Sequence, residues 1–191
     1  MMKRIINNLK FGFTLIEVSV TMAILGLVLG SIYGVYNLSQ KAYTTEENMI
    51  EITQNGRVVL ERLSREIRQA TEIVTELPDE EVSATSNIMF EDGHILEPYY
   101  YIRYFQDDGS IKREVLGFYF SGDPGETLVP WDALPPPGQT LIMETIQGAQ
   151  TIGEYVSQLK FWGSRVVSIV LELNKKENNL RLETNIFGRN F

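Results

Sequence analysis

The segment Phe11-Gly12-Phe13-Thr14-Leu15-Ile16-Glu17 decides how the first part of this 191-residue chain is interpreted, because it places a carboxylate at the start of a long apolar run. That run is Val18 to Gln40, which carries no formal charge and is dominated by Val, Ile, Leu, Ala, Met and Gly. As a helix it would be about 34 Å long, enough to cross a hydrocarbon core of roughly 30 Å. The sequence therefore predicts a membrane-spanning helix with an acidic residue at its mouth.

A short basic segment with Lys3, Arg4 and Lys10 precedes the apolar run. The positive-inside tendency predicts that this N-terminus is cytoplasmic before processing and that the bulk of the chain lies on the other side of the membrane. An ordinary secretory signal would have a small-residue cleavage site after the apolar run, and none follows Leu38. We therefore expect the apolar helix to be retained.

Glu17 has two interpretations. An acidic group within a membrane helix costs about 2.5 to 3.5 kcal/mol at mid-helix and usually has a partner, which favours a functional role. Alternatively, Glu17 caps the start of the helix, where a carboxylate is favoured by the positive end of the helix dipole.

The residues from Gly12 to Glu17, followed by the apolar helix, resemble the type III signal of the type IV pilin and pseudopilin superfamily. The resemblance implies that a prepilin peptidase cuts between Gly12 and Phe13 and that the new amino group of Phe13 is N-methylated. Glu17 would then be the fifth residue of the mature chain, neutralised by the amino terminus of a neighbouring subunit. Such a pair would set the axial register between subunits.

The same resemblance implies the partners and the location of the protein. The partners would be other minor and major pseudopilins or pilins, contacted through N-terminal helices, together with the prepilin peptidase, an inner-membrane assembly platform and membrane lipid. We expect a single-pass protein of the inner membrane whose globular domain is periplasmic.

Three glycines, Gly26, Gly30 and Gly34, recur at four-residue spacing on one face of the apolar helix. Each costs up to about 1 kcal/mol relative to Ala in a helix. They indicate either a face where neighbouring helices approach closely or a stretch that loosens when subunits leave the bilayer for a filament.

The periodicity predicts that the helix continues beyond the membrane segment, because apolar residues recur at three- and four-residue steps and no proline occurs before Pro78. We expect docking on the chain's own sheet rather than a coiled-coil seam, since the spacing drifts toward 3.6. The expected organisation is a leader (1–12), a membrane helix (13–40), its amphipathic continuation (41–75) and a β-rich domain (76–191). The stripe comprises Met49, Ile52, Gly56, Val59, Leu60, Leu63, Ile67, Ala70 and Val74.

The remaining sequence predicts strands, and antiparallel strands packed on an amphipathic helix make an α+β domain. The turn Asp107-Asp108-Gly109-Ser110 predicts a hairpin and lacks the spaced oxygens of a calcium loop. Gly122 to Gly138 is a proline- and glycine-rich loop carrying Trp131, and Asn174 to Asn179 is a polar turn. The predicted strands are 87–91, 95–105, 111–119, 141–146, 156–161, 166–173 and 180–187.

Composition offers little for catalysis or ligand binding. The net charge is −8, and removal of the leader leaves 14 basic against 25 acidic side chains, so direct nucleic-acid binding is not expected. The chain has no cysteine and one histidine, His94, so neither a catalytic triad nor a histidine-rich metal site is expected. Asp79 and Glu80-Glu81 lie in a polar loop where solvated charge is the ordinary interpretation. We therefore predict no catalytic residue, no cofactor and no enzyme activity.

Tyrosines gather at the start of the second predicted strand, in the sequence Tyr99-Tyr100-Tyr101 with Tyr104 and Phe105 following. Their partial alternation predicts that some rings face a core, while outward rings would be contact points for a partner subunit.

A second resemblance concerns the helix segment Arg62 to Ala70, the Leu159-Lys160-Phe161 strand and the terminal hairpin ending Gly188-Arg189-Asn190-Phe191. These features resemble J-type minor pseudopilins of type II secretion, and also W-type minor pilins and the F-type competence pseudopilin. The absence of cysteine argues against a major pilin with a disulfide-closed loop. The resulting hypothesis is a minor pseudopilin that primes or caps a short filament for protein export. The alternatives are a minor pilin of a type IV pilus or DNA-uptake filament and a membrane-tethered binding module.

Overall fold

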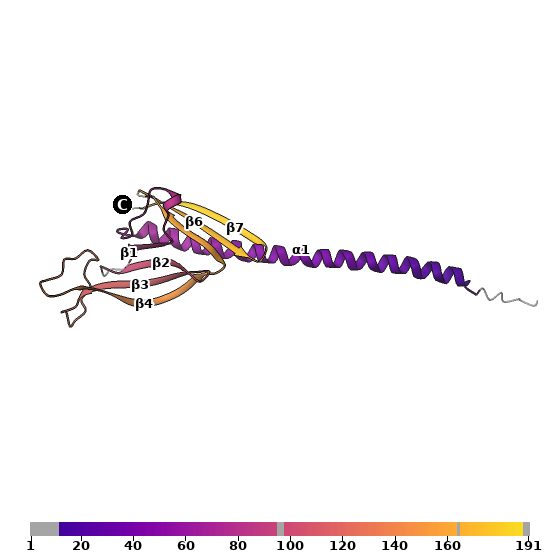
Figure 1. Cartoon of the computed structure of the whole chain (residues 1–191), viewed down its shortest axis with the longest axis horizontal. Coiled ribbons are helices and arrows are strands. Elements are labelled where there is room, and N and C mark those ends of the chain that lie inside the picture. Colours follow the sequence, from indigo (N-terminus) through magenta and orange to yellow (C-terminus); the bar gives the residue numbers. More distant parts are fainter. Residues whose placement is uncertain (1–11, 95–97, 164, 189–191) are drawn as a thin grey trace, which may run out of the picture. The chain divides into compact units, whose positions relative to one another are not determined.

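The computed structural model describes residues 12–94, 98–163 and 165–188 (Figure 1). The chain divides into two compact units, Met1–Thr44 and Thr45–Phe191, and the long helix α1 belongs to both. We call residues 15–44 the anchor part of α1 and residues 45–69 its docked part. The elements are α1 (Leu15–Gln69), η1 (Glu81–Ser83), β1 (Asn87–Glu91), β2 (Tyr101–Asp107), β3 (Ser110–Phe120), β4 (Leu141–Gly153), β5 (Val156–Trp162), β6 (Val166–Lys175) and β7 (Asn178–Phe187).

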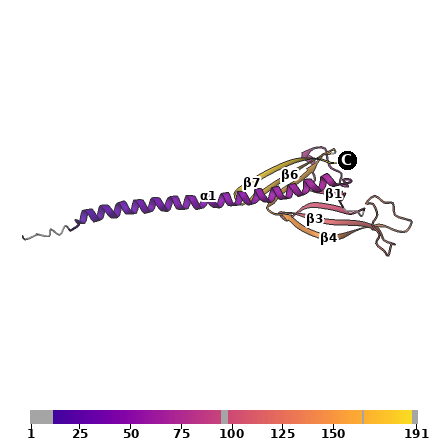
Figure 2. The ribbon, with the colours of Figure 1, turned by 180° about the vertical axis from the view of Figure 1, so that it is seen from behind.

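The docked part of α1 forms the core of the second unit together with two sheets (Figures 1 and 2). Its residues Ile52, Val59, Leu63 and Ile67 are at most 1% exposed and lie on one face at helical spacing. They pack against side chains of both sheets, so the predicted docking of the apolar stripe on the chain's own strands is confirmed.

All neighbouring strands are antiparallel, which confirms the α+β prediction. The strands form two sheets: sheet A has the order β1-β2-β3-β4 and sheet B the order β5-β6-β7. The break falls at the turn between β4 and β5, where Tyr155 has a φ of 63°. This change of direction lets the two sheets enclose the docked part of α1.

Two hairpin turns were predicted and both are present. Asp107 pairs with Ser110 across the two-residue loop Asp108-Gly109, whose φ angles of 42° and 68° suit a type I′ turn. The turn between β6 and β7 closes with Lys175 paired to Asn178.

The helix ends at Gln69, before the expected end near Thr75. The segment after Gln69 runs beside β1 instead, because Thr71 N–H donates to Glu91 O at 3.1 Å and Val74 N–H donates to Met89 O at 2.8 Å. Backbone pairing with a neighbouring strand has therefore replaced the last helical turn, which local periodicity could not indicate.

Two strand boundaries also differ from the predictions. β2 begins at Tyr101 rather than at the predicted Ile95, and residues 95–97 lie outside the described residues. The strand starts late because Pro98 has no N–H to donate to a neighbouring strand and Tyr99 has a φ of 72°. β4 continues to Gly153 rather than ending at Ile146, because its glycine-containing second half stays paired with β3 through three register shifts.

Residues at the β6–β7 turn and at the β4–β5 turn contact the first turns of the docked part. The Asn178 side chain donates to the Thr45 carbonyl at 3.2 Å, and Asn55 donates to the Glu154 carbonyl at 2.8 Å. Between them, Glu51 pairs with Lys175 and accepts a 2.9 Å hydrogen bond from the Tyr155 hydroxyl. These contacts hold α1, from Thr45 onward, in the second unit, Thr45–Phe191, which we call the folded unit.

Candidate processing and assembly site

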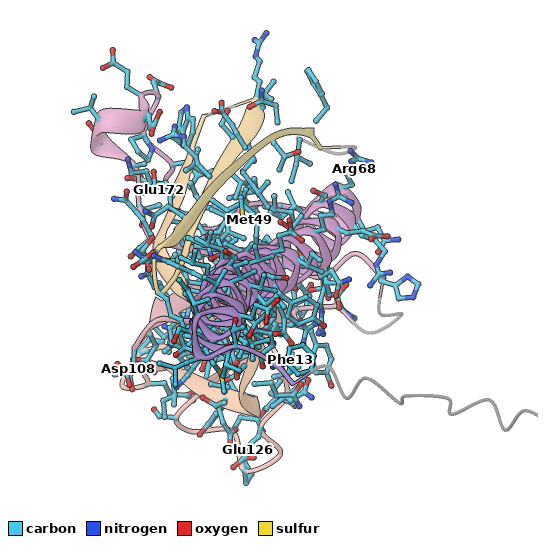
Figure 3. The ribbon with its side chains drawn as sticks, turned by 90° about the vertical axis from the view of Figure 1, so that its right-hand side faces the viewer. Phe13, Met49, Arg68, Asp108, Glu126 and Glu172 are labelled. Carbon is cyan, nitrogen blue, oxygen red and sulfur yellow. The ribbon has the colours of Figure 1, made fainter. Side chains whose placement is uncertain are left out.

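The predicted cleavage position lies in non-helical backbone. Gly12, Phe13 and Thr14 precede α1, and the Phe13 side chain at the start of the helix is 87% exposed (Figure 3). The peptide bond between Gly12 and Phe13 is thus free of helical hydrogen bonding, as a peptidase substrate requires. Cleavage at this bond and methylation of Phe13 remain predictions.

Thr14 and Glu17 form a reciprocal cap on the first turn of α1. The Thr14 N–H and hydroxyl each donate to Oε2 of Glu17 at 2.9 Å, and the Glu17 N–H donates to the Thr14 hydroxyl at 3.3 Å. This is the capping-box arrangement, in which residues three positions apart satisfy each other's backbone donors at a helix start. The spacing Thr-x-x-Glu before an apolar run is a sequence signal for it, yet sequence reasoning assigned Thr14 no role.

The capping geometry bears on both interpretations of Glu17. It shows how one chain stabilises this carboxylate through Thr14, without a group from a second subunit, in agreement with the capping interpretation. Among the described residues, however, only Oε2 of Glu17 receives hydrogen bonds, so Oε1 is left to accept from another group. The register role of Glu17 therefore stays a prediction that the geometry leaves room for.

The anchor part of α1 has the length and composition needed to cross a membrane, and its most apolar window is unburied. The large apolar side chains from Phe13 to Leu38 are between 46% and 88% exposed. Two of its hydroxyl groups are satisfied within the helix, because Ser19 and Ser31 donate to the carbonyls of Leu15 and Leu27 at 3.0 and 2.8 Å. Such a surface is stable only when lipid or other helices cover it.

The glycines of the anchor part lie on an open face. A Cβ atom added at Gly26, Gly30 or Gly34 would meet no atom within 4 Å. A close-packing face and a stretch that loosens both fit this observation, so the two interpretations stay open.

The folded unit uses its polar clusters for structure. Glu66 accepts hydrogen bonds from the Tyr104 hydroxyl at 2.7 Å and from Arg113 Nε at 3.0 Å, and pairs with Arg62 at 3.1 Å. Burial raises the pKa of Glu66, but the hydrogen bonds from Tyr104 and Arg113 outweigh it, and the net pKa is lowered. Burial and the Glu66 charge raise the pKa of Tyr104.

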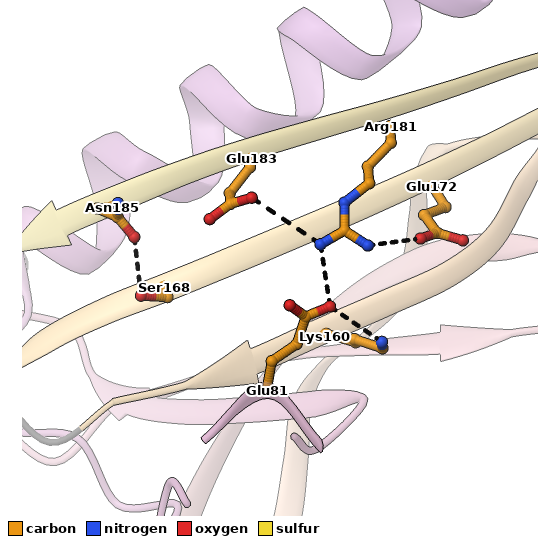
Figure 4. Close-up of polar contacts among 7 residues, drawn as sticks. All are labelled: Glu81, Lys160, Ser168, Glu172, Arg181, Glu183 and Asn185. Carbon is orange, nitrogen blue, oxygen red and sulfur yellow. Dashed lines mark hydrogen bonds and ion pairs between the residues drawn. The ribbon is translucent and has the colours of Figure 1, made fainter. Parts of the chain in front are cut away.

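The predicted acidic loop is tied to sheet B by ion pairs (Figure 4). Glu81 pairs with Arg181 at 3.0 Å and with Lys160 at 3.2 Å, and Arg181 also pairs with Glu172 at 3.1 Å. Hydrogen bonds from Arg181 and Lys160 lower the pKa of Glu81, which keeps the carboxylate ionised. Glu81 is therefore a paired surface charge rather than a solvated one.

The remaining candidate residues are accounted for by local structure. The backbone N–H of His94 donates to the Asp92 side chain at 2.9 Å, and no group of three or more His, Asp or Glu side chains among the described residues could hold a metal ion. Tyr101 and Tyr104 are buried, and burial raises the pKa of Tyr101 to about 12. The inward interpretation of the tyrosine cluster is thus correct for these two rings.

Comparison with known proteins gives a match at the N-terminus. The family model described as the prokaryotic N-terminal methylation motif matches residues 7–33. No match was found among the curated proteins or among the solved structures. The match covers the predicted cleavage position, the Thr14–Glu17 cap and the anchor part as far as Tyr33.

Proposed function

We propose that this chain, a type IV pilin-like protein by its N-terminal motif, is a minor pseudopilin: a structural subunit of a type II secretion pseudopilus assembled from the inner membrane. The observation that carries this proposal is the unburied anchor helix, which begins within the residues that match the methylation motif. Its surface requires lipid in one state and neighbouring helices in the other.

The processing step follows from the exposed segment before α1. In the proposal, a prepilin peptidase cuts between Gly12 and Phe13, Phe13 is N-methylated, and the leader is lost. The anchor part then crosses the inner membrane with the folded unit on the periplasmic side. Glu17 uses its remaining carboxylate oxygen to accept from the amino terminus of a neighbouring subunit, which fixes the axial register.

The minor rather than major role is supported by two sequence features. The chain has no cysteine and so lacks a disulfide-closed C-terminal loop. The segment Arg62 to Ala70 carries the resemblance to minor subunits. Within it, Arg62 and Glu66 form an ion pair, and Glu66 accepts hydrogen bonds from Tyr104 on β2 and Arg113 on β3 that join the helix to sheet A. Proteins with the N-terminal motif are structural subunits, and the polar clusters of this chain are used for packing.

Mass spectrometry of the chain from native membranes tests the processing step. The expected mature N-terminus is methylated Phe13, and a Gly12→Val variant is expected to keep its leader because the side chain blocks the cut. A wild-type chain that still starts at Met1 would refute the proposed processing.

A complementation experiment tests the assembly role. Deletion of the gene is expected to stop export of secreted enzymes, and the wild-type gene is expected to restore it. Glu17→Ala should insert normally into the membrane but fail to restore export. Unchanged export in the deletion strain together with lost pili or DNA uptake would reassign the chain to a type IV pilus or competence filament.

A further inference from the structure

Among the described strands, β1 and β4 are the edges of sheet A, and β5 and β7 are the edges of sheet B. An edge strand presents unpaired backbone N–H and C=O groups that can template the addition of another strand. Natural proteins cover such edges or guard them with charges, prolines or bulges. The protection of each edge therefore shows where another strand can add.

The edge of β1 is covered by the chain that follows α1. Thr71 donates to the Glu91 carbonyl at 3.1 Å, and the Glu91 N–H donates to the Glu72 carbonyl at 2.9 Å. Val74 donates to the Met89 carbonyl at 2.8 Å. This edge is occupied by backbone from the same molecule.

The edge of β5 is satisfied by two sets of hydrogen bonds from the same chain. Thr85 and Phe161 exchange reciprocal backbone hydrogen bonds of 3.1 and 2.8 Å. Further along, the Gln106 side chain takes the place of a neighbouring strand, because its amide donates to Ser157 O at 3.2 Å and accepts from Leu159 N–H at 2.9 Å. Backbone groups at this edge are thereby satisfied from within the chain.

The edge strand β7 is guarded by charge. Arg181 and Glu183 lie two residues apart on the solvent-exposed face of β7. Arg181 forms an ion pair with Glu172 at 3.1 Å (Figure 4). An added strand would have to accommodate these charges, which makes pairing there unfavourable.

Within the part of the chain that the structure describes, no backbone segment, proline or bulge protects the first five residues of β4. The register shifts of β4 fall between Thr145 and Gly153, whereas Leu141 to Thr145 pair with β3 without interruption. β4 contains no lysine, arginine or proline, and its one formal charge is Glu144. Met143 is 51% exposed. This segment is a regular, nearly uncharged open edge.

The hydrogen-bonding phase identifies the groups that face outward. Ser121 N–H donates to Thr140 O at 2.9 Å, so Thr140 is turned toward β3. Because antiparallel strands alternate, the N–H and C=O groups of Leu141, Met143 and Thr145 point away from β3. Among the described residues, no backbone hydrogen bond reaches these outward groups.

We propose that this edge pairs antiparallel with the same segment of a second copy of the chain, centred on Met143. The three outward residues are symmetric about Met143, so Met143 would face its counterpart and Leu141 would face Thr145 of the other copy. Ile142 would lie opposite Glu144, so no like charges oppose each other. This matters because the chain is strongly acidic, with a net charge of −8, and two copies approach best where charge is sparse. The pairing involves the folded unit alone and does not rest on the proposed function.

Cysteine cross-linking in membranes tests this pairing directly, because the natural chain has no cysteine. In a hydrogen-bonded antiparallel pair the two Cα atoms at position 143 would be about 5.5 Å apart. That separation lies within the range of about 4.4 to 6.8 Å that a disulfide requires. Mild oxidation of full-length Met143→Cys is therefore expected to convert most of the chain to a disulfide-linked dimer.

Two controls separate strand pairing from random collision. Gln147→Cys lies on the same strand but about 27 Å from its counterpart in the proposed register, so it should not cross-link. Leu134→Cys is on the proline-rich loop and 92% exposed, so it reports collision alone. Three results would each overturn the proposal. The cysteine at position 143 could form no more dimer than the one at 134, the cysteine at 147 could form more dimer than the one at 143, or the cross-linked product could contain a different protein.

A third variant separates this proposal from the assembly role of the anchor helix. Glu17→Ala combined with Met143→Cys should cross-link as fully as Met143→Cys alone, because the paired edge is in the folded unit. Loss of the cross-link in the double variant would show that the contact depends on helix assembly and would refute independent strand pairing.

Discussion

The Tyr104 hydroxyl on β2 donates a 2.7 Å hydrogen bond to the carboxylate of Glu66 on α1, and this bond joins the docked helix to sheet A. Hydrogen bonds to charged groups contribute about 1.5 to 3 kcal/mol. Tyr104→Phe should lower the free energy of unfolding by about that amount, measured by urea denaturation of a fragment that begins at Thr45. The main core lies at or after Ile52, so this fragment is expected to fold.

The matched control for this bond is Tyr119→Phe, which removes a hydroxyl that makes no hydrogen bond with the described residues. Its unfolding free energy should equal that of the wild type. Equal stabilities for Tyr104→Phe and Tyr119→Phe would show that the bond to Glu66 adds nothing.

The same carboxylate predicts acid sensitivity. The pKa of Glu66 is lower in the folded protein than its ordinary value of about 4.3, so the unfolded chain takes up this proton at higher pH. The stability that ionised Glu66 contributes is complete above about pH 5 and is lost as pH falls through the folded pKa. Glu66→Gln should be less stable at pH 7 and should lose less stability than wild type between about pH 5 and 3.

Denaturation curves at several pH values provide this measurement. Glu61→Gln, which changes an exposed acid five residues earlier on the same helix, controls for the loss of one negative charge. If Glu66→Gln and wild type lost stability in parallel on acidification, Glu66 would not be a source of the acid sensitivity.

A third prediction concerns the point where α1 ends. A Cβ atom at Gly93 would lie 2.0 Å from the Gln69 carbonyl oxygen, which is backbone and cannot rotate away. Gly93→Ala should therefore destabilise the folded unit by about 1 to 3 kcal/mol, the usual range for overpacking. Thermal unfolding measures it.

Gly148→Ala on β4 is the control for that substitution, because an added Cβ there meets nothing within 4 Å. It should unfold close to the wild-type temperature. A Gly93→Ala variant that is equally stable would mean that the turn after β1 moves freely away from the helix end.

A fourth prediction separates helix capping from charge at Glu17. Thr14→Val removes the hydroxyl of the cap but leaves the carboxylate, whereas Glu17→Gln removes the charge and keeps a group that can accept from Thr14. If charge sets the register, Thr14→Val should assemble nearly normally and Glu17→Gln should not. The measurement is the fraction of membrane-inserted chain recovered in filaments or cross-linked to sister subunits.

Equal impairment of the two variants would mean that the start of α1, rather than a charge pair, is what assembly needs. The comparison requires that Thr14→Val and Glu17→Gln insert into the membrane in similar amounts, which fractionation measures.

Local patterns predicted most of the strand positions in this fold. β1 spans the predicted residues 87–91, and both two-residue turns, Asp108-Gly109 and Lys176-Glu177, lie where turn residues indicated them. Alternation and turn chemistry act over a few residues, so the sequence carries them directly.

Features that depend on distant partners could not be predicted in this way. The end of α1 at Gln69 is set by pairing of Thr71 with β1, and the second half of β4 is held by β3 through register shifts. The division into two sheets and the amide of Gln106 closing the β5 edge have no local signature. At the candidate site, Glu17 was found from the motif, whereas Thr14 was missed although its spacing to Glu17 was visible.

The contacts at the start of the docked part determine where mechanical load would enter the folded unit. Asn178 donates to the Thr45 carbonyl, and six residues later Glu51 contacts Lys175 and Tyr155. Tension applied along α1 would reach these side-chain contacts before it reaches the apolar core around Ile52 and Val59. We expect these contacts at the tip of the β6–β7 hairpin to break before such tension disturbs the apolar core.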